Sequence, residues 1–581
     1  MNLSRHARLP FLLLATLLGG LDCWTTRNTL NPMGVSYLDM GDAFFRGDWA
    51  TAINGLWSPL YSLPLGLALR ILKPSASFEF PLVHLVNYAI YLCALIAFDF
   101  FLKELIRVRR ERALSRIDEH TVALPEWAWQ LLGYALFVWS SLGLITLGAT
   151  APDMLVSVFV YLALAQVLRI SRGAQSRWSF FILGLILGIG YLAKAPMLPL
   201  SVVFLLVGIF WVGVLRSAAP RVMVMVLGLV LAAGPFIVAL SASKGRLTFG
   251  ESGRLNYLWH VNRIPFFHWQ GGDTRFGVPA HPTRKILDNP SIYEFGTPMN
   301  VTYAPWYDPS YWYEGVTPRL DRRQQTTALM ANARMYFEIF THNSQLILLA
   351  GFLLLLYVGR RRWLKELSKE WGLIVLSIAA FALYLPVHVE PRYIAPFITS
   401  FWLGLFSTLK LPARKNQRSG TSGPGNLSAR KKLIAWVIVP VVSLVLLAAI
   451  ARSMDAFYSS FTKMPGSERD NTKVYLEVAD ALGRKGIQPG DPVGMVNFDS
   501  RWLPVVHWAR LARVHIVAEL PNTDAGTFAA ADDSRRREVI DAFAKTGAKA
   551  VIATRVPENV TLPGWEQVGQ TDYYTLKLSQ P

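Results

Sequence analysis

Two acidic residues stand among aromatic side chains in residues 28–79, between the first two apolar stretches. Asp39 and Asp42 occur in the run VSYLDMGDAFFRGDW. Residues 36–46 are predicted to form a short helix, in which Asp39 and Asp42, three positions apart, share a face. A partly desolvated carboxylate near a membrane is suited to accept a proton from a hydroxyl group. The alternative is structural: Asp42 pairs with Arg46, and Asp39 caps or solvates the helix.

Two more charged residues stand at the ends of apolar stretches. Asp153 follows the run GATAP, and Lys194 lies in the run YLAKAP between two apolar segments. Asp153 is either a helix cap next to Pro152 or a second carboxylate facing the same cavity as residues 28–79. In the second case it could hold a divalent cation or share acid–base roles. Lys194 either extends along apolar surface to reach water or binds a phosphate group.

The densest group of ionisable residues is the run HVEPRY at 388–393. Ionisable side chains clustered at a break between membrane helices are functional candidates. His388, Glu390, Arg392 and Tyr393 are therefore predicted to contact a substrate. The alternative is an internal ion pair between Glu390 and Arg392.

The composition predicts that membrane helices position these residues. The chain has 581 residues, of which 52% are hydrophobic and 17% charged, and its mean hydropathy is +0.31. Such values are typical of polytopic membrane proteins, and each crossing needs about 20 apolar residues. The apolar stretches give eleven candidate spans. The fifth, 178–193, and the sixth, 196–215, are short and could instead form a re-entrant pair. The eleven candidate spans are residues 9–26, 80–102, 127–147, 153–169, 178–193, 196–215, 222–241, 343–359, 371–388, 393–410 and 433–451.

Basic residues are concentrated in short segments on one side of the predicted bundle. An excess of Lys and Arg marks the cytoplasmic side. The chain is therefore expected in the cytoplasmic (inner) membrane with its N-terminus in the cytoplasm. Because the number of spans is odd, the C-terminus is expected outside. Residues 453–581 hold 15 basic and 16 acidic residues, so the net charge of +19 arises elsewhere and does not predict nucleic-acid binding. The segments with the excess hold 25 basic residues and are 1–8, 103–116, 169–177, 216–221, 358–370 and 410–432.

Three regions on the opposite side are too large to be connectors. They are residues 28–79, 242–342 and 453–581. The second has 18 aromatic residues between 242 and 341, which suits it to bind sugars or isoprenoid chains. Its Pro and Gly content argues against long regular helices.

Residues 453–581 are predicted to form a small α/β domain, because short apolar strands alternate with helical patterns. A flexible basic linker at 411–432 and a last transmembrane helix at 433–452 precede it. Strands are expected at 493–496, 514–518, 550–553 and as a pair within 566–578, and helices at 474–485, 502–511 and 534–546.

In this order, the motifs resemble the GT-C superfamily of membrane glycosyltransferases. That group includes bacterial enzymes that modify lipid A or lipopolysaccharide with polyprenyl-phosphate-linked sugars, and protein O-mannosyltransferases. The resemblance covers residues 9–410 and implies a GT-C-like transmembrane catalytic domain over residues 1–410. It rests on the acidic helix of the first loop, APD at 151–153, AKAP at 193–196 and E-x-R-Y at 390–393.

The resemblance implies transfer of a sugar, with inversion, from a polyprenyl-phosphate donor to a lipid, polysaccharide or protein acceptor. Asp39 would be the general base, and Asp153 would assist it or bind a divalent cation such as Mg or Mn. Asp42 is expected to bind substrate beside Asp39. Lys194 and Arg392 would stabilise the departing lipid phosphate. One residue departs from the pattern, because Met33 stands where the lipid A-modifying relatives carry an acidic residue, about four positions before the tyrosine.

Two other functions are open on the sequence alone. A transporter or flippase of a lipid-linked glycan would have ionisable residues in mid-span and repeat symmetry. Here the charged candidates lie mostly at the outer ends of spans, and the sequence has no evident repeat. A non-catalytic membrane subunit is the other alternative, and Met33 favours it.

Overall fold

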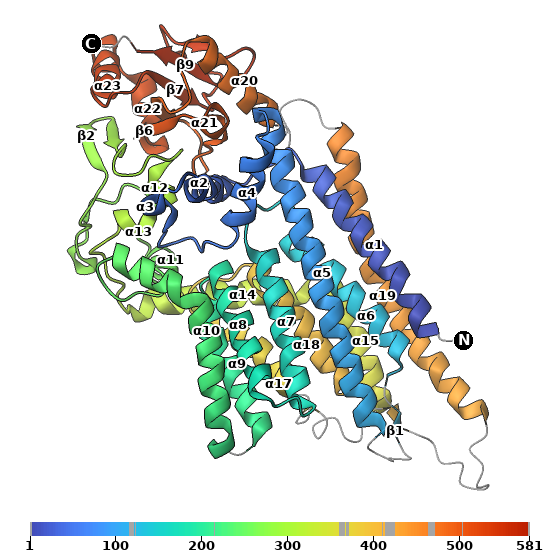
Figure 1. Cartoon of the computed structure of the whole chain (residues 1–581). Coiled ribbons are helices and arrows are strands. Elements are labelled where there is room, and N and C mark those ends of the chain that lie inside the picture. The colour runs from blue at the N-terminus through green and yellow to red at the C-terminus, as the bar shows by residue number, and fades with distance from the viewer. Residues whose placement is uncertain are drawn as a thin grey trace.

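Apolar helices form a bundle, and residues 28–79, 242–342 and 453–581, here called the three outer regions, gather at one end of it (Figure 1). The computed structural model describes residues 3–114, 121–122, 124–213, 215–359, 367, 371–409, 411–412, 424–462, 471–501 and 503–578. The bundle helices are α1 (Leu3–Thr26), α5 (Ala76–Leu114), α6 (Glu126–Trp139), α7 (Asp153–Ser171), α8 (Arg177–Ala193), α9 (Met197–Val212), α10 (Leu215–Ser243), α15 (Asn343–Gly359), α17 (Trp371–Tyr384), α18 (Pro391–Ser407) and α19 (Pro424–Thr462).

Each of the eleven predicted spans coincides with one of these helices, and the helical membrane fold is confirmed. By length and composition, six of the described helices can cross a membrane unaided: α1, α5, α6 with its π-helical extension Ser140–Ile145, α7, α10 and α19. A seventh crossing is possible if α14 (Arg322–Thr341) and α15, which meet at 66°, form one bent span. The number of eleven crossings stays a prediction.

Close backbone approach holds part of the bundle together. α8 packs along α10, and Gly184 and Gly188, four residues apart on α8, face it. A Cβ atom at Gly184 would lie 1.9 Å from the carbonyl oxygen of Met225. Small residues at this spacing allow membrane helices to pack closely.

The first outer region, residues 28–79, forms three short helices. α2 (Pro32–Arg46), α3 (Trp49–Ala52) and α4 (Ser62–Leu72) lie between the bundle and the C-terminal domain (Figure 1). α2 and α4 touch through Gly41 and Gly66, because a Cβ atom at Gly41 would lie 2.9 Å from the Cα atom of Gly66. The predicted acidic helix is thus confirmed, and it begins four residues earlier than expected.

The second outer region, residues 242–342, is mostly irregular and rich in buried aromatic side chains. The expectation of no long regular helix is wrong at its end, where α14 spans 20 residues free of Pro and Gly. Its other elements are α11 (Ser252–Asn256), the π-helical Tyr257–Val261, the 3-10 turn Thr274–Phe276, β2 (Arg284–Asp288), β3 (Ser291–Glu294), α12 (Ala304–Tyr307) and α13 (Pro309–Trp312).

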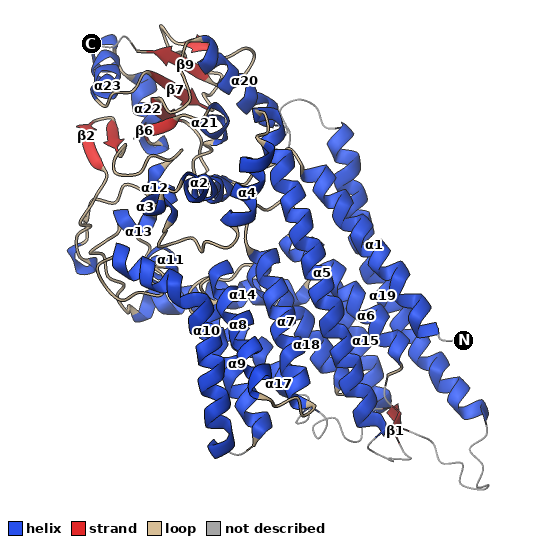
Figure 2. Cartoon of the chain, viewed as in Figure 1, coloured by secondary structure: helices blue, strands red, loops and turns tan. Residues whose placement is uncertain are grey.

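The C-terminal domain is built on a sheet of the order β2-β3-β6-β5-β7-β9-β8 (Figure 2). The central strand β5 pairs in parallel with β6 and β7, and the outer pairings are antiparallel. The predicted α/β domain is confirmed in type. Its elements are α20 (Asn471–Arg484), β5 (Pro492–Asn497), α21 (His507–Ala512), β6 (His515–Leu520), α22 (Asn522–Ala530), α23 (Asp533–Lys545), β7 (Ala550–Thr554), β8 (Glu566–Gln567) and β9 (Tyr574–Lys577).

Two predicted boundaries change. The hairpin β2-β3 belongs to the second outer region, yet Tyr293 of β3 pairs with Glu519 of β6, so the sheet extends beyond residues 453–581. α19 begins at Pro424 and runs to Thr462, which makes the end of the predicted linker helical. Residues 413–423 of that linker lie outside the described residues. At the opposite end of the bundle, a short strand β1 (Thr121–Val122) pairs with β4 (Leu411–Pro412).

Candidate active site

Six of the eight residues singled out in the sequence meet at the end of the bundle that faces the C-terminal domain. They come from three breaks between helices: the start of α7, the turn between α8 and α9, and the start of α18. We call this group the Asp153 cluster, and its members are Asp153, Lys194, His388, Glu390, Arg392 and Tyr393.

Proline residues shape these three breaks. Pro152 precedes α7, Pro196 precedes α9, and Pro391 occupies the first turn of α18. Proline lacks a backbone N–H and fixes φ, so it suits a helix start. Asp153 is the first residue of α7 and its carboxylate contacts Lys194, so the capping interpretation of Asp153 is wrong.

Cations and carboxylates alternate in the Asp153 cluster. Lys194 Nζ lies 2.5 Å from Asp153 Oδ1, and Arg392 Nη1 lies 3.5 Å from Asp153 Oδ2. Arg392 Nε lies 2.5 Å from Glu390 Oε2. His388 Nε2 and the Tyr393 hydroxyl each lie 3.2 Å from Glu390 Oε1. The predicted Glu390–Arg392 pair therefore exists, but as one part of a larger network.

Burial affects the charges of this cluster. The Asp153 side chain is 2% exposed and that of Lys194 is 21% exposed. Burial lowers the pKa of Lys194, and the charge of Asp153 opposes this effect. Burial raises the pKa of Glu390, but the hydrogen bonds and charges of His388 and Arg392 outweigh it, so the pKa is lowered overall. The cluster combines two cations with an ionised carboxylate at its more exposed edge.

Aromatic side chains from the outer regions border the cluster. Tyr37 of α2 and Tyr61 pack edge-on at 5.0 Å between ring centroids. Burial raises the pKa of both hydroxyl groups, and the nearby charge of Asp153 raises it further. His260 stacks on His388 at 3.8 Å, and burial lowers the pKa of His260 to about 4. The sequence offered no signal for His260, since its neighbour in the stack is 128 positions away.

The other two candidates, Asp39 and Asp42, belong to a separate group. We call it the Arg510 cluster, after the Arg510 side chain of α21, which is 3% exposed. Arg510 lies 2.8 Å from Asp39, 2.6 Å from Asp42 and 2.6 Å from Glu79. Arg513 lies 3.2 Å from Asp42 and also pairs with Glu79. Asp42 thus pairs with the C-terminal domain. The structural alternative, in which Asp42 pairs with Arg46, is wrong.

Both oxygens of Asp39 accept hydrogen bonds. Oδ1 accepts from the Thr302 hydroxyl at 2.9 Å and from Arg510 at 2.8 Å, and Oδ2 accepts from the Thr302 backbone N–H at 2.9 Å. Burial raises the pKa of Asp39, and the Arg510 guanidinium and the Thr302 donors oppose this effect. These contacts occupy the atoms that a general base would use.

Helix geometry explains why Asp39 and Asp153 lie in different groups. Tyr37 and Asp39 are two positions apart on α2, so their side chains point about 200° apart around the helix axis. Tyr37 is near Asp153, whereas Asp39 contacts Arg510. Asp39 and Asp153 therefore belong to different groups, and the expectation that Asp153 faces the same cavity as residues 28–79 stays a prediction.

The donor set around Asp153 does not fit a divalent cation. Its nearest charged groups are the Lys194 ammonium and the Arg392 guanidinium, which would repel a metal ion. Within the described part of the chain, no three His, Cys, Asp or Glu side chains are grouped as metal ligands.

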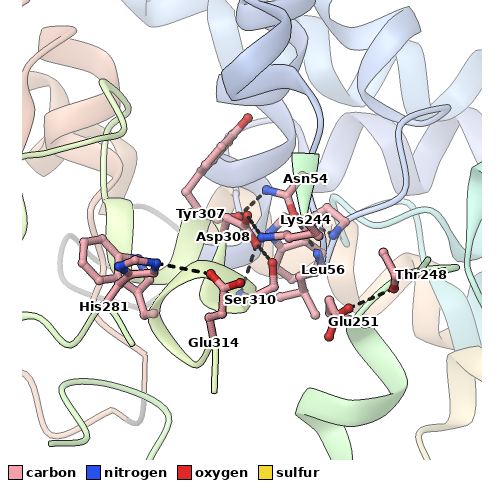
Figure 3. Close-up of polar contacts among 12 residues, drawn as sticks. Asn54, Leu56, Lys244, Thr248, Glu251, His281, Tyr307, Asp308, Ser310 and Glu314 are labelled. Carbon is pink, nitrogen blue, oxygen red and sulfur yellow. Dashed lines mark hydrogen bonds and ion pairs between the residues drawn. The ribbon is translucent and has the colours of Figure 1, made fainter. Parts of the chain in front are cut away.

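A third polar group fastens the first outer region to the second (Figure 3). Lys244 Nζ lies 3.2 Å from Asp308 Oδ2, and the Ser310 hydroxyl donates to Asp308. Asn54 donates to the Tyr307 carbonyl at 2.6 Å. These residues satisfy one another, so we assign them a structural role.

Comparisons with known proteins give a distant likeness. No family model and no curated protein matches the chain. Its structure is similar to the crystal structure of ArnT from Cupriavidus metallidurans bound to undecaprenyl phosphate, at 13% identity and a TM-score of 0.48, covering 98% of this chain and 97% of that chain. It is also similar to the Archaeoglobus fulgidus oligosaccharyltransferase in complex with Zn and sulfate, at 12% identity and a TM-score of 0.43, covering 94% and 67%.

Proposed function

We propose that the chain is a membrane glycosyltransferase that moves a sugar from a polyprenyl-phosphate donor to an acceptor hydroxyl at the outer face of the cytoplasmic membrane. The observation that carries the proposal is the pair of cations held by Asp153. Lys194 and Arg392 both contact this one buried carboxylate at the outer end of the apolar helices. A phosphate at the end of a lipid chain would meet both cations as it reaches the bilayer surface.

In this proposal the two cations act on the leaving group. As the bond between the sugar C1 and the phosphate oxygen breaks, negative charge grows on the phosphate. Lys194 and Arg392 would stabilise that charge more strongly in the transition state than in the bound donor. The polyprenyl phosphate then leaves with the electron pair of the broken bond.

The acceptor hydroxyl attacks C1 from the opposite side, which inverts the configuration, and its proton passes to a carboxylate. We assign this role to Asp153, because its buried Oδ2 atom accepts no hydrogen bond from the described residues and its ion-pair contact with Arg392 is 3.5 Å long. The prediction that Asp39 is the base stays a prediction. The three hydrogen bonds of Asp39 favour a positioning role instead.

A test compares the glycans of the cell envelope with and without the gene by mass spectrometry. We expect deletion to remove one modification and to cause one polyprenyl-linked sugar to accumulate. The wild-type gene should restore the modification, and Asp153→Asn should lower the rate about 100- to 10,000-fold, as loss of a general base does. Lys194→Gln should also fail to restore it.

The matched control is Lys285→Gln, which removes a lysine from β2, away from the Asp153 cluster. It should restore the modification fully. Full restoration by Asp153→Asn would exclude Asp153 as the base. An unchanged glycan profile after deletion would instead favour a non-catalytic subunit. This is the second candidate function, and it is supported by Met33, which packs against the core.

A further inference from the structure

A basic groove lies between α2, α4 and the C-terminal domain, on the side of α2 that carries Asp42. It consists of two adjoining pockets of about 360 Å³ and 400 Å³, and both are lined by Asp42, Arg46 and Arg513. Arg510 lines the first pocket, and Arg70 and Lys73 line the second. None of these residues belongs to the Asp153 cluster.

The groove has an excess of positive charge. Within the described residues, Arg46, Arg70 and Lys73 form no ion pair, and all three are exposed. Asp42, the one acidic residue shared by the two pockets, is already paired with Arg510 and Arg513. Five cations stand against three carboxylates when the whole Arg510 cluster is included. An anion in the groove would therefore meet cations without a partner.

One buried nitrogen is also left without a partner. Arg510 contacts three carboxylates, yet its Nη2 atom has no hydrogen-bond partner among the described residues. A buried donor without a partner costs free energy. A ligand oxygen in the first pocket, which Arg510 lines, would approach this guanidinium.

The groove adjoins an apolar surface that can rest on a membrane. On α4, the side chains of Leu67, Ile71 and Leu72 are 46%, 66% and 61% exposed. α4 lies at the end of the bundle, beside the start of α5 (Figure 1). A helix with such a face lies in the interface between water and lipid, where neighbouring cations reach the headgroups. Phe45 and Leu69 give the second pocket an apolar wall.

We propose that this groove binds the phosphate-bearing headgroup of an anionic membrane lipid, with the acyl chains directed along α4 into the bilayer. Cations on a membrane-facing helix attract anionic lipids, and the combination of a cationic rim with apolar walls matches an anionic amphiphile. The site is separate from Lys194 and Arg392. The proposal of a lipid site does not depend on the proposed transfer reaction.

The test is native mass spectrometry of the full chain in neutral detergent, titrated with phosphatidylglycerol or with phosphatidylcholine. We expect the wild-type chain to retain phosphatidylglycerol more strongly. The triple variant Arg46→Gln, Arg70→Gln, Lys73→Gln should lose roughly tenfold or more of that affinity and bind both lipids alike. Its melting temperature reports whether it is folded.

The control removes three exposed cations elsewhere in the outer regions: Arg263→Gln, Arg322→Gln, Arg323→Gln. It should retain phosphatidylglycerol as the wild type does. Equal loss in both triple variants, or no loss in the groove variant, would overturn the proposal. A third arm adds inorganic phosphate, and displacement of the lipid by millimolar phosphate would show a site for the free anion and overturn the assignment to a lipid.

Discussion

Lys194 is the residue whose protonation most directly controls the proposed site. It is partly buried, it contacts Asp153, and its ammonium lies 3.6 Å from the centre of the Tyr393 ring. Burial disfavours the charged form, and this lowers the pKa below the ordinary value of 10.5. A bound phosphate would favour the charged form again. Donor binding should therefore take up a proton when the pH exceeds the lowered pKa.

This coupling predicts the pH dependence of binding. As the pH rises through the lowered pKa of Lys194, the ammonium loses its proton and the affinity for polyprenyl phosphate should fall, by up to about tenfold per pH unit. Lys194→Arg keeps its charge at all these pH values, so its affinity should be nearly independent of pH. Binding of polyprenyl phosphate between pH 7 and pH 10 checks this. Lys285→Arg, the matched control, should behave as the wild type, and an equal slope in both variants would contradict the assignment.

The Asp153 cluster was accessible to sequence reasoning, and the Arg510 cluster was not. Asp153, Lys194 and Glu390 each stand at the end of an apolar stretch, so hydropathy and sidedness alone bring them to one end of the bundle. Asp39 and Arg510 are 471 positions apart and belong to different domains. No local pattern distinguishes Arg510 from an exposed helix residue. A charged side chain in an outer loop therefore has two interpretations until its partner is known.

Among the elements, α2 is held in place by contacts on two opposite faces. It lies between the bundle and the C-terminal domain, with Tyr37 towards the Asp153 cluster and Asp39 towards Arg510. Its distance from α4 is set by glycines, because a Cβ atom at Gly41 would lie 2.8 Å from the carbonyl oxygen of Ser62. A shift of α2 away from α4 would therefore disturb the contacts of Tyr37 or those of Asp39.

Gly41→Ala should separate α2 from α4. Such overpacking typically costs about 1–3 kcal/mol, and the shift should also lower the rate of sugar transfer because Tyr37 moves with the helix. Thermal unfolding and the glycan profile measure the two effects. Gly526→Ala in α22, where a new Cβ atom meets nothing within 4 Å, is the control and should leave both unchanged or slightly improve stability. Wild-type behaviour of Gly41→Ala would show that the contact is not limiting.

Elements with a strong local pattern were predictable, and elements defined by distant partners were not. The bundle helices and β5, β6 and β7 follow from apolar runs of suitable length. The hairpin β2-β3 has only five and four residues, and its partner strand lies over 200 positions later. Its pairing with β6 depends on the tertiary arrangement, so the domain boundary at residue 453 could not be corrected from the sequence.

Across the whole molecule, the C-terminal domain is joined to the membrane part by buried polar contacts. Arg510 contacts carboxylates from α2 and from the start of α5, and Tyr303 of the second outer region donates to Glu519 of β6 at 2.5 Å. Each of these buried charges is stabilised by the opposite charges and hydrogen bonds of its partners. Removing one partner leaves the others in an environment of low polarity without compensation.

Arg510→Met should therefore be among the most damaging substitutions in the C-terminal domain. It leaves Asp39, Asp42 and Glu79 together with only Arg513 as a cation, and breaking a buried ion pair in this way costs about 3–5 kcal/mol. Adding Asp39→Asn and Glu79→Gln to Arg510→Met removes two of the uncompensated charges and should recover part of the loss. Thermal unfolding of the full chain measures both variants. Arg334→Met, which breaks an exposed pair with Glu338, should cost less than about 1 kcal/mol. If Arg510→Met were as mild as this control, the Arg510 cluster would not hold the two parts together, and the position of α2 would have to depend on its packing alone.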